Sequence, residues 1–159
     1  MKYKFDVYVA LAMHGRKVGD ILVQTFLAKA FCKKYGLSAY FPSEDEGLDK
    51  LDRDSLIDSK PDLDKMKWYV SKDDKNLDKC QTLLVLTGDN SSSGTGWEQG
   101  RMFYKHKRPI ILVAPRMFYG KLTNFTTIKS SYIRPTIEEA VHCIANILRG
   151  APCHTSTKE

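Results

Sequence analysis

Short apolar runs alternate with longer segments of helical periodicity along most of the chain. The apolar runs contain few polar positions, which is typical of strands buried on both faces of a sheet. The predicted strands cover residues 4–12, 37–41, 82–87, 109–114 and 128–133. The predicted helices cover residues 20–35, 61–79, 95–106 and 136–148. Strands that alternate with helices indicate a parallel sheet with right-handed crossovers.

This order predicts an α/β fold, a single-domain flavodoxin-like or Rossmann-like three-layer sandwich around a parallel sheet of about five strands. The 159 residues suit one domain. We place that domain at residues 1–150 and expect the polar tail, residues 151–159, to be disordered. No apolar run is long enough for a membrane span, and the N-terminus lacks a signal-peptide core. We therefore expect a cytoplasmic protein without a membrane partner.

Capping residues mark the ends of the first and last predicted helices. Asp20 can cap the first helix and Gly36 can end it. Thr136 and Glu139 form a capping box at the start of the last helix. On the first helix, the residues expected on the inner side are Ile21, Phe26, Leu27, Ala30 and Phe31.

The four cysteines are scattered along the chain. They are Cys32, Cys80, Cys143 and Cys153. None forms a Cys-x-x-Cys pair, so neither a zinc site nor a redox motif is indicated. We expect all four to be reduced thiols, with Cys32 and Cys143 filling the core.

The net charge of +6 is unevenly distributed. Residues 44–64 are rich in Asp and Glu, and segment 43–60 is equally consistent with a lid or a solvated insert. Between Glu98 and Glu138 there is no acidic residue but there are eight Lys or Arg residues. A basic half indicates an anionic partner, either a phosphorylated small molecule or nucleic acid. Because no known nucleic-acid-binding pattern is present, nucleic acid is the weaker alternative.

A glycine-rich and serine-rich loop, residues 88–100, follows the third predicted strand. In open α/β sheets, ligands bind at the carboxyl ends of the strands. Glu98 is expected in the first turn of the next helix, where the helix dipole favours an ionised carboxylate. Gly96 and Gly100 would let a ligand or another backbone come close to it. Alternatively, Thr95 and Glu98 form a capping box and Glu98 only satisfies a backbone N–H.

The two commonest nucleotide signatures of such folds are missing. No Gly-x-Gly-x-x-Gly follows the first strand, and no Walker A loop is present.

Residues 89–100 and the segment 101–113 that follows them resemble the core of the nucleoside 2-deoxyribosyltransferase superfamily. The shared pattern is a strand, an Asp, a Ser-x-Gly-Thr-x-x-Glu-x-Gly loop, a helix and a strand led by Lys/Arg-Pro. Residues 72–80 are similar to the family's Arg-Asp-Leu segment, and Val7–Ala10 resembles its first strand. The similarity covers most of residues 4–114.

This resemblance implies an enzyme that cleaves N-glycosidic bonds of nucleosides or nucleotides and needs no cofactor or metal. By position, Glu98 would be the nucleophile and Tyr8 would hold it by a hydrogen bond. Asp73 would orient Glu98 or a sugar hydroxyl, and Asp89 would stand near the base. An ionised carboxylate can attack an anomeric carbon and form a covalent glycosyl intermediate.

Three features differ from the family's pattern. Gln81 stands where an Asp is expected, Asp74 stands in place of Leu, and the first loop lacks a Gly-Pro. Asp74 therefore competes with Asp73 for the role of the site carboxylate.

The first loop resembles the branch of the family that hydrolyses nucleoside 5′-monophosphates. Arg16 can bind a phosphate through two hydrogen bonds, and serine hydroxyls and loop amides can complete the cradle. The residues expected to bind substrate or phosphate are His14, Gly15, Arg16, Ser92, Ser93, Gly94 and Gly96.

Several functions remain open at this point. The first is hydrolysis of (deoxy)nucleoside 5′-monophosphates, and the second is base exchange on free deoxynucleosides, which would not need Arg16. The third is a non-catalytic nucleotide-binding or signalling module; a NAD-cleaving enzyme has no specific support. The resemblance also implies a homo-oligomer. The aromatic residues expected in the core or in subunit contacts are Trp68, Trp97, Phe103 and Tyr104.

Overall fold

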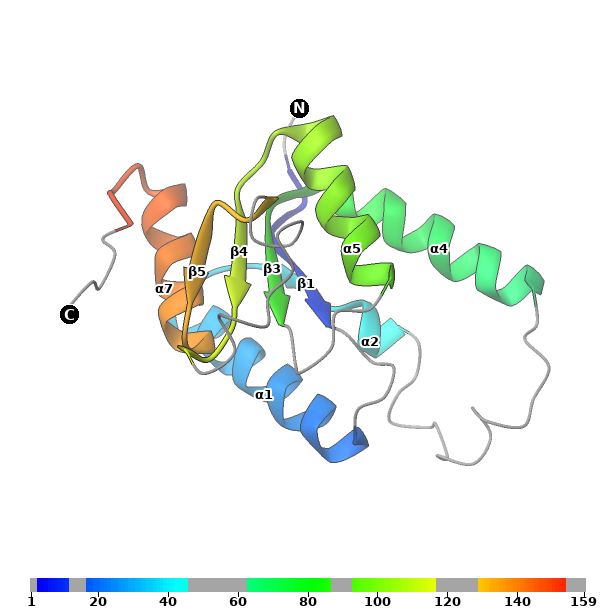
Figure 1. The fold of residues 1–159 in the computed structure, drawn as a ribbon, viewed down its shortest axis with the longest axis horizontal. Coiled ribbons are helices and arrows are strands. Elements are labelled where there is room, and N and C mark those ends of the chain that lie inside the picture. The colour runs from blue at the N-terminus through cyan, green and yellow to red at the C-terminus, as the bar shows by residue number, and fades with distance from the viewer. Residues whose placement is uncertain (1–2, 12–16, 46–62, 87–92, 117–128, 154–159) are drawn as a thin grey trace.

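The computed structural model describes residues 3–11, 17–45, 63–86, 93–116 and 129–153. They form a five-stranded, fully parallel sheet in the order β2-β1-β3-β4-β5 (Figure 1). The strands are β1 (Phe5–Leu11), β2 (Ala39–Tyr40), β3 (Cys80–Leu86), β4 (Ile110–Val113) and β5 (Tyr132–Arg134). The helices are α1 (Val18–Lys34), α2 (Pro42–Asp45), α4 (Leu63–Leu77), α5 (Ser93–Gly100), the π-helical η2 (Arg101–His106) and α7 (Ile137–Leu148).

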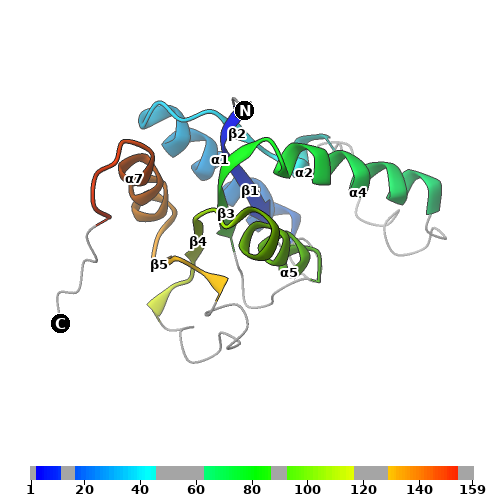
Figure 2. The ribbon, with the colours of Figure 1, turned by 90° about the horizontal axis from the view of Figure 1, so that it is seen from above.

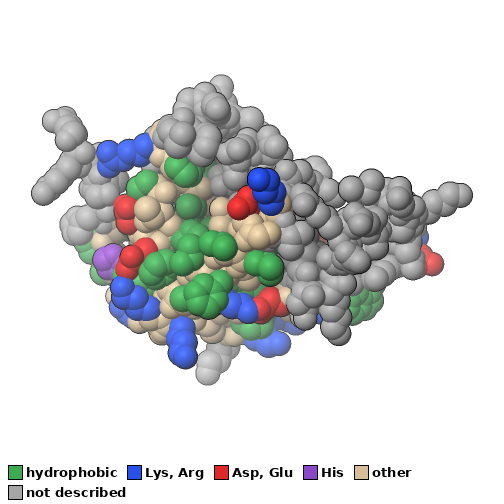
Figure 3. Space-filling model, turned by 90° about the horizontal axis from the view of Figure 1, so that it is seen from below, with side chains coloured by type: hydrophobic (Ala, Val, Ile, Leu, Met, Phe, Trp, Pro, Cys, Tyr) green, Lys and Arg blue, Asp and Glu red, His purple; other side chains and the backbone are tan. Residues whose placement is uncertain are grey.

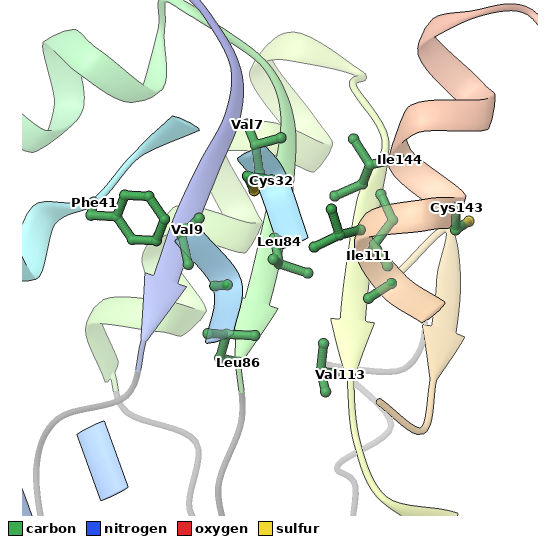
Figure 4. Close-up of a cluster of buried hydrophobic side chains, with 13 residues drawn as sticks. Val7, Val9, Cys32, Phe41, Leu84, Leu86, Ile111, Val113, Cys143 and Ile144 are labelled. Carbon is green, nitrogen blue, oxygen red and sulfur yellow. The ribbon is translucent and has the colours of Figure 1, made fainter. Parts of the chain in front are cut away.

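The sheet is the middle of three layers, as the sequence predicted. Helices α1 and α7 cover one face, and α4 and α5–η2 cover the other (Figure 2). Successive residues of a strand point to opposite faces. Val7, Val9 and Leu84 therefore pack with α1 and α7 (Figure 4), whereas Tyr8 and Leu83 pack with α4 and η2.

The strand order places β1 beside β3, with Leu11 registered against Leu86 at their carboxyl ends. In this order the chain winds in opposite directions from β1 and from β3, which is the point where open α/β sheets bind ligands. Residues 12–16 and 87–92 follow these two neighbouring strand ends in the chain. Their own conformation lies outside the described residues.

Two of the five residues predicted on the inner side of α1 lie there, because Ile21 is buried and Phe31 packs against the core. Phe26 is 70% exposed, and Leu27 and Ala30 are also exposed, whereas Ala28 and Cys32 are buried against the sheet. Hydrophobic side chains gather on the face of the molecule over α1 (Figure 3). The other three positions were predicted wrongly because apolar side chains lie on several sides of this helix, so its periodicity does not select one face.

The two predicted helix starts have different outcomes. Helix α1 begins one turn earlier than predicted, with Lys17 at the N-cap, so Asp20 lies in the first turn rather than capping it. The capping box of α7 is confirmed, because the Glu139 backbone N–H donates to Thr136 Oγ1 at 3.2 Å. Gly36 ends α1 with a positive φ of 70°, a conformation that favours glycine.

The fifth strand and the long polar segment also differ in extent from the prediction. Strand β5 begins at Tyr132, four residues later than expected. Within segment 43–60, the described part belongs to the short helix α2, and residues 46–60 lie outside the described residues.

Two of the four cysteines are paired, which corrects the prediction of four reduced thiols. Cys143 of α7 and Cys153 form a disulfide, with their Cα atoms 5.1 Å apart. The chain turns back after Gly150, where φ is 72°, and Ala151 N–H donates to Asn146 O at 2.8 Å. Cys32 and Cys80 are free and buried. Burial raises the pKa of each of these two thiols to about 12, so they are protonated at neutral pH.

No helix in the described part of the chain combines the length and the apolar character needed to cross a membrane.

Candidate active site

The candidate site is built around a hydrogen bond between Tyr8 of β1 and Glu98 of α5. The Tyr8 hydroxyl donates to Glu98 Oε1 at 2.8 Å. Tyr8 is fully buried because its position in β1 points into the layer of α4 and α5. Strand alternation thus places a phenol beneath the carboxylate that the sequence singled out. The contact expected from the family resemblance is present, and its catalytic role stays a prediction.

The surroundings of Tyr8 keep it protonated. Burial is the main cause that raises the pKa of Tyr8 above its ordinary value of 10.0, followed by the negative charges of Glu98 and Asp73. A raised phenol pKa favours the neutral form, so Tyr8 acts as a hydrogen-bond donor throughout the neutral range.

Asp73 of α4 is held by a second tyrosine. The Tyr40 hydroxyl donates to Asp73 Oδ1 at 3.2 Å. Tyr40 is the register partner of Tyr8 across β1 and β2, and the two rings lie 5.4 Å apart. Two adjacent tyrosines on one face of the sheet therefore hold the two carboxylates, Tyr8 binding Glu98 and Tyr40 binding Asp73.

Sequence reasoning did not single out Tyr40. The signal was available, because Tyr40 lies within the predicted second strand, residues 37–41, directly before Phe41-Pro42. Its pairing with Tyr8 follows only once the parallel register of β1 and β2 is known.

Asp74, the competing carboxylate, is bound elsewhere. Trp97 Nε1 donates to Asp74 Oδ1 at 3.1 Å, and Arg101 Nη1 donates to Asp74 Oδ2 at 3.0 Å. Consecutive residues of a helix point about 100° apart. Asp73 therefore faces the tyrosines, while Asp74 faces side chains of α5 and η2. The geometry places Asp73, rather than Asp74, with Tyr8 and Glu98.

The capping-box interpretation of Glu98 is wrong. Helix α5 begins at Ser93, so Thr95 lies inside the helix and is 3% exposed. Glu98 lies beyond the first turn, which contains no acidic residue, so the helix dipole affects it less than expected. The carboxylate is instead bound by a residue ninety positions earlier in the chain.

The two glycines near Glu98 have different surroundings. Among the described residues, a Cβ added at Gly96 would meet nothing within 4 Å. At Gly100, a Cβ would lie 3.4 Å from Lys129 Nζ. The close neighbour at Gly100 is thus a lysine of the chain itself. Lys129 is 4% exposed, and burial lowers its pKa from the ordinary value.

Gln81, which stands where the family has an Asp, binds Asp6 at the amino ends of the strands, opposite to the ends near Glu98. Its Nε2 donates to Asp6 Oδ1 at 2.9 Å, and Asp6 Oδ2 also accepts from the Ser38 N–H at 2.8 Å. These contacts join the amino ends of β1 and β3, away from Glu98.

Several predicted site residues cannot be placed. His14, Gly15, Arg16, Asp89 and Ser92 lie outside the described residues, as does the side chain of Ser93. Gly94 is described and exposed in the first turn of α5.

The structure also describes possible metal ligands and the four aromatic residues expected in the core or in subunit contacts. Among the described residues, no group of three or more His, Cys, Asp or Glu side chains is arranged to hold a metal ion. The aromatic residues assigned to core or subunit contacts are not in the core of the chain. They are exposed, namely Trp68, Trp97, Phe103 and Tyr104.

No protein-family model and no curated protein sequence matches the chain. Several solved structures have similar folds, among them two that cover most of this chain. One is a 2-deoxyribosyltransferase from the psychrotolerant bacterium Bacillus psychrosaccharolyticus, with a TM-score of 0.62 and 17% identity over 84% of this chain and 88% of that one. The other is a conserved protein from Enterococcus faecalis V583, with a TM-score of 0.62 and 13% identity over 90% of this chain and 98% of that one. At these identities the likeness concerns the fold, a five-stranded parallel sheet with helices on both faces.

Proposed function

We propose that the protein cleaves the N-glycosidic bond of (deoxy)nucleoside 5′-monophosphates through a glycosyl-Glu98 intermediate and passes the sugar to water. The observation that carries this proposal is the Tyr8–Glu98 hydrogen bond, with Asp73 held close by Tyr40. The shared fold with a 2-deoxyribosyltransferase supports the choice of a nucleoside substrate. Together they favour an enzyme over a non-catalytic module, which has no use for a buried tyrosine aimed at a carboxylate.

In the first step, the Glu98 carboxylate attacks the anomeric carbon while the bond from that carbon to the base nitrogen breaks. The electron pair of that bond leaves with the base, which takes a proton. Asp89 is the proposed donor or base-positioning group. Asp73 orients Glu98 or a sugar hydroxyl during this attack.

In the second step, water attacks the anomeric carbon, loses a proton and displaces the Glu98 carboxylate. The Tyr8 hydroxyl donates to this carboxylate at 2.8 Å in the free enzyme, so it stabilises the charge that returns to Glu98 when the ester bond breaks. The raised pKa of Tyr8 keeps the required proton in place.

Phosphate recognition is assigned to the loops after β1 and β3. Arg16 supplies the cation, His14 and Gly15 lie beside it in sequence, and Ser92 and Ser93 supply hydroxyls. The amides of Gly94 and Gly96 complete the cradle. The register of Leu11 with Leu86 supports this pairing, because both loops start from adjacent strand ends.

The alternative function is base exchange on free deoxynucleosides, favoured by the name of the structural neighbour. It uses the same Glu98 ester but transfers the sugar to a second base. The two functions differ in the acceptor and in the need for Arg16.

The deciding experiment is chromatography of products after incubation with nucleosides and 5′-monophosphates, with and without a second free base. The proposal predicts release of base and sugar phosphate from monophosphates without an acceptor. Arg16→Ala should lower kcat/KM for monophosphates at least tenfold more than for nucleosides. Turnover that requires a second base, or equal effects of Arg16→Ala on both substrate classes, would contradict the proposed hydrolase.

We also propose a homo-oligomer, with α5 and η2 as the contact, and a cytoplasmic location. The exposed rings of Trp97, Phe103 and Tyr104 support the contact, since interfaces are rich in such side chains. The Cys143–Cys153 disulfide weighs against the location, because disulfides seldom persist in the cytosol. Light scattering of the purified protein tests the homo-oligomer, and counting of free thiols in cell extracts tests the cytoplasmic location.

A further inference from the structure

Arg101 lies at the junction between α4 and the helix that carries Glu98. Its Nη1 donates to Asp74 Oδ2 at 3.0 Å. Its Nε and Nη2 donate to Asp78 Oδ1 and Oδ2, each at 3.0 Å. One guanidinium therefore bridges two carboxylates four residues apart, Asp74 within α4 and Asp78 directly after its end, a geometry that a lysine cannot reproduce.

This bridge is better shielded from water than the lysine ion pairs described. The side chains of Arg101 and Asp74 are 19% and 26% exposed. For comparison, Lys105, which also binds Asp78, is 52% exposed. Exposed ion pairs contribute little to stability, whereas shielded pairs with several hydrogen bonds hold their geometry more firmly.

The bridge adjoins both carboxylates of the proposed site. Asp74 follows Asp73 directly on α4, and Trp97 precedes Glu98 directly on α5. Trp97 Nε1 and Arg101 Nη1 donate to the two different oxygens of Asp74. We call these three residues, Arg101, Asp74 and Trp97, the Arg101 clamp. Each site carboxylate thus has its immediate chain neighbour in the clamp.

The tyrosines bind the site carboxylates directly, whereas the clamp acts on the helices that carry them. Tyr8 and Tyr40 bind Glu98 and Asp73 from the sheet. The clamp joins the two helices that carry those carboxylates. Without it, α5 is tied to α4 near the site by fewer contacts among the described residues, and the separation of Glu98 from Asp73 is less well fixed.

Loss of Arg101 acts mainly on Asp74. Asp78 would keep Lys105 Nζ at 3.0 Å and His106 Nε2 at 2.7 Å. Of the contacts described for the Asp74 carboxylate, only that with Trp97 would remain.

We propose that Arg101, acting through Asp74, is a positioning residue that sets the placement of Glu98 relative to Asp73 and Tyr8. This inference rests on the proposed function, since it assigns the clamp a purpose in that reaction. A displacement of about 1 Å between reacting groups can cost about a hundredfold in rate, so the placement of the nucleophile affects kcat more than substrate binding.

The kinetic test compares Arg101→Gln, Asp74→Asn and the double variant, with Lys105→Gln as matched control. Lys105 is a cation one turn further along that binds Asp78 but not Asp74. We expect each clamp variant to lower kcat about tenfold with KM within about twofold, and the double variant to fall no further. Arg101→Lys should recover part of the loss. Unchanged kcat in the clamp variants, or an equal loss in Lys105→Gln, overturns the inference.

A second measurement does not depend on turnover. The ¹³Cζ NMR signal of Tyr8, assigned with Tyr8→Phe, reports its hydrogen bond to Glu98. Arg101→Gln and Asp74→Asn remove opposite charges, so direct electrostatics would move this signal in opposite directions. Displacement of Glu98 moves it in the same direction in both variants.

A shift of the Tyr8 signal in the same direction in both clamp variants, absent from Lys105→Gln, supports the inference. Opposite shifts, or none, overturn it. If the wild-type protein released no base from any substrate, the proposed function would fail while this signal would still decide whether the clamp positions Glu98.

Discussion

At the scale of single residues, the sequence revealed the positions that a motif marks but not those defined only by contacts between distant segments. Glu98, Tyr8 and Asp73 were singled out because a motif resemblance marks their positions, and in the structure Tyr8 donates to Glu98 while Asp73 accepts from Tyr40. Tyr40 and Arg101 were missed because their partners, Asp73 and Asp74, lie 33 and 27 positions away. Contacts across such separations arise from the packing of α4 against the sheet and α5, which periodicity does not specify.

Tyr8→Phe tests the hydrogen bond to Glu98 with little change in shape. A hydrogen bond to a charged group contributes roughly 1.5–3 kcal/mol, so kcat should fall about 10-fold to 100-fold. KM should change much less, because the bond matters most when the charge returns to Glu98. Steady-state kinetics on the preferred substrate measures both values. A Tyr8→Phe enzyme with wild-type kcat would show that the phenol has no part in turnover.

Tyr40→Phe tests the support of Asp73 in the same way. This hydrogen bond is longer, at 3.2 Å, and Tyr40 binds Asp73 rather than the proposed nucleophile. A loss of about threefold to tenfold in kcat is therefore expected, corresponding to a net hydrogen bond of about 1 kcal/mol. Leu83→Met on the same face of the sheet serves as the packing control, since it should leave kcat near the wild-type value. The assignment of Asp73 would be contradicted if the two variants behaved alike.

At the scale of elements, prediction succeeded where sequence pattern and burial agree. The strands are short apolar runs bounded by polar residues. Both ends of four of the five strands lie within two residues of their predicted positions. Helix α7 combines an N-cap at Thr136 with one apolar face, and its start was predicted from that cap. Helix α1 lacks such a face, and its orientation is decided by contacts with the sheet.

Paired substitutions in α1 test this corrected orientation. Phe26→Ser should change the free energy of unfolding by no more than about 0.5 kcal/mol, because the side chain is 70% exposed. Ala28→Leu should destabilise by about 1–3 kcal/mol, because Ala28 is fully buried and an added side chain overpacks the core. Urea denaturation measures both changes. The reverse order of effects would mean that α1 presents the originally predicted face.

At the scale of the whole molecule, the parallel sheet and its three layers followed from the alternation of strands and helices. The strand order required the structure, because the sequence does not state on which side of β1 the chain continues. That order explains why residues from β1, β2, α4 and α5 meet at one place. The disulfide between Cys143 and Cys153 could not be anticipated either, since it depends on the turn after Gly150.

Thiol titration tests the disulfide. The denatured but unreduced protein should show two free thiols, Cys32 and Cys80, and four after reduction. By the chain-entropy estimate for closing a loop of this size, reduction should lower the free energy of unfolding by roughly 2–3 kcal/mol. Four free thiols before reduction would show that the bond is absent from the protein in solution.

The central claim is that Glu98 is the nucleophile in the cleavage of a glycosidic bond. Its most direct test is chromatography of the products that wild-type enzyme and Glu98→Ala form from (deoxy)nucleoside 5′-monophosphates, with circular dichroism to establish that the variant is folded. The account predicts free base and sugar phosphate from the wild type and none above background from Glu98→Ala. Base release by a folded Glu98→Ala enzyme at the wild-type rate would contradict it.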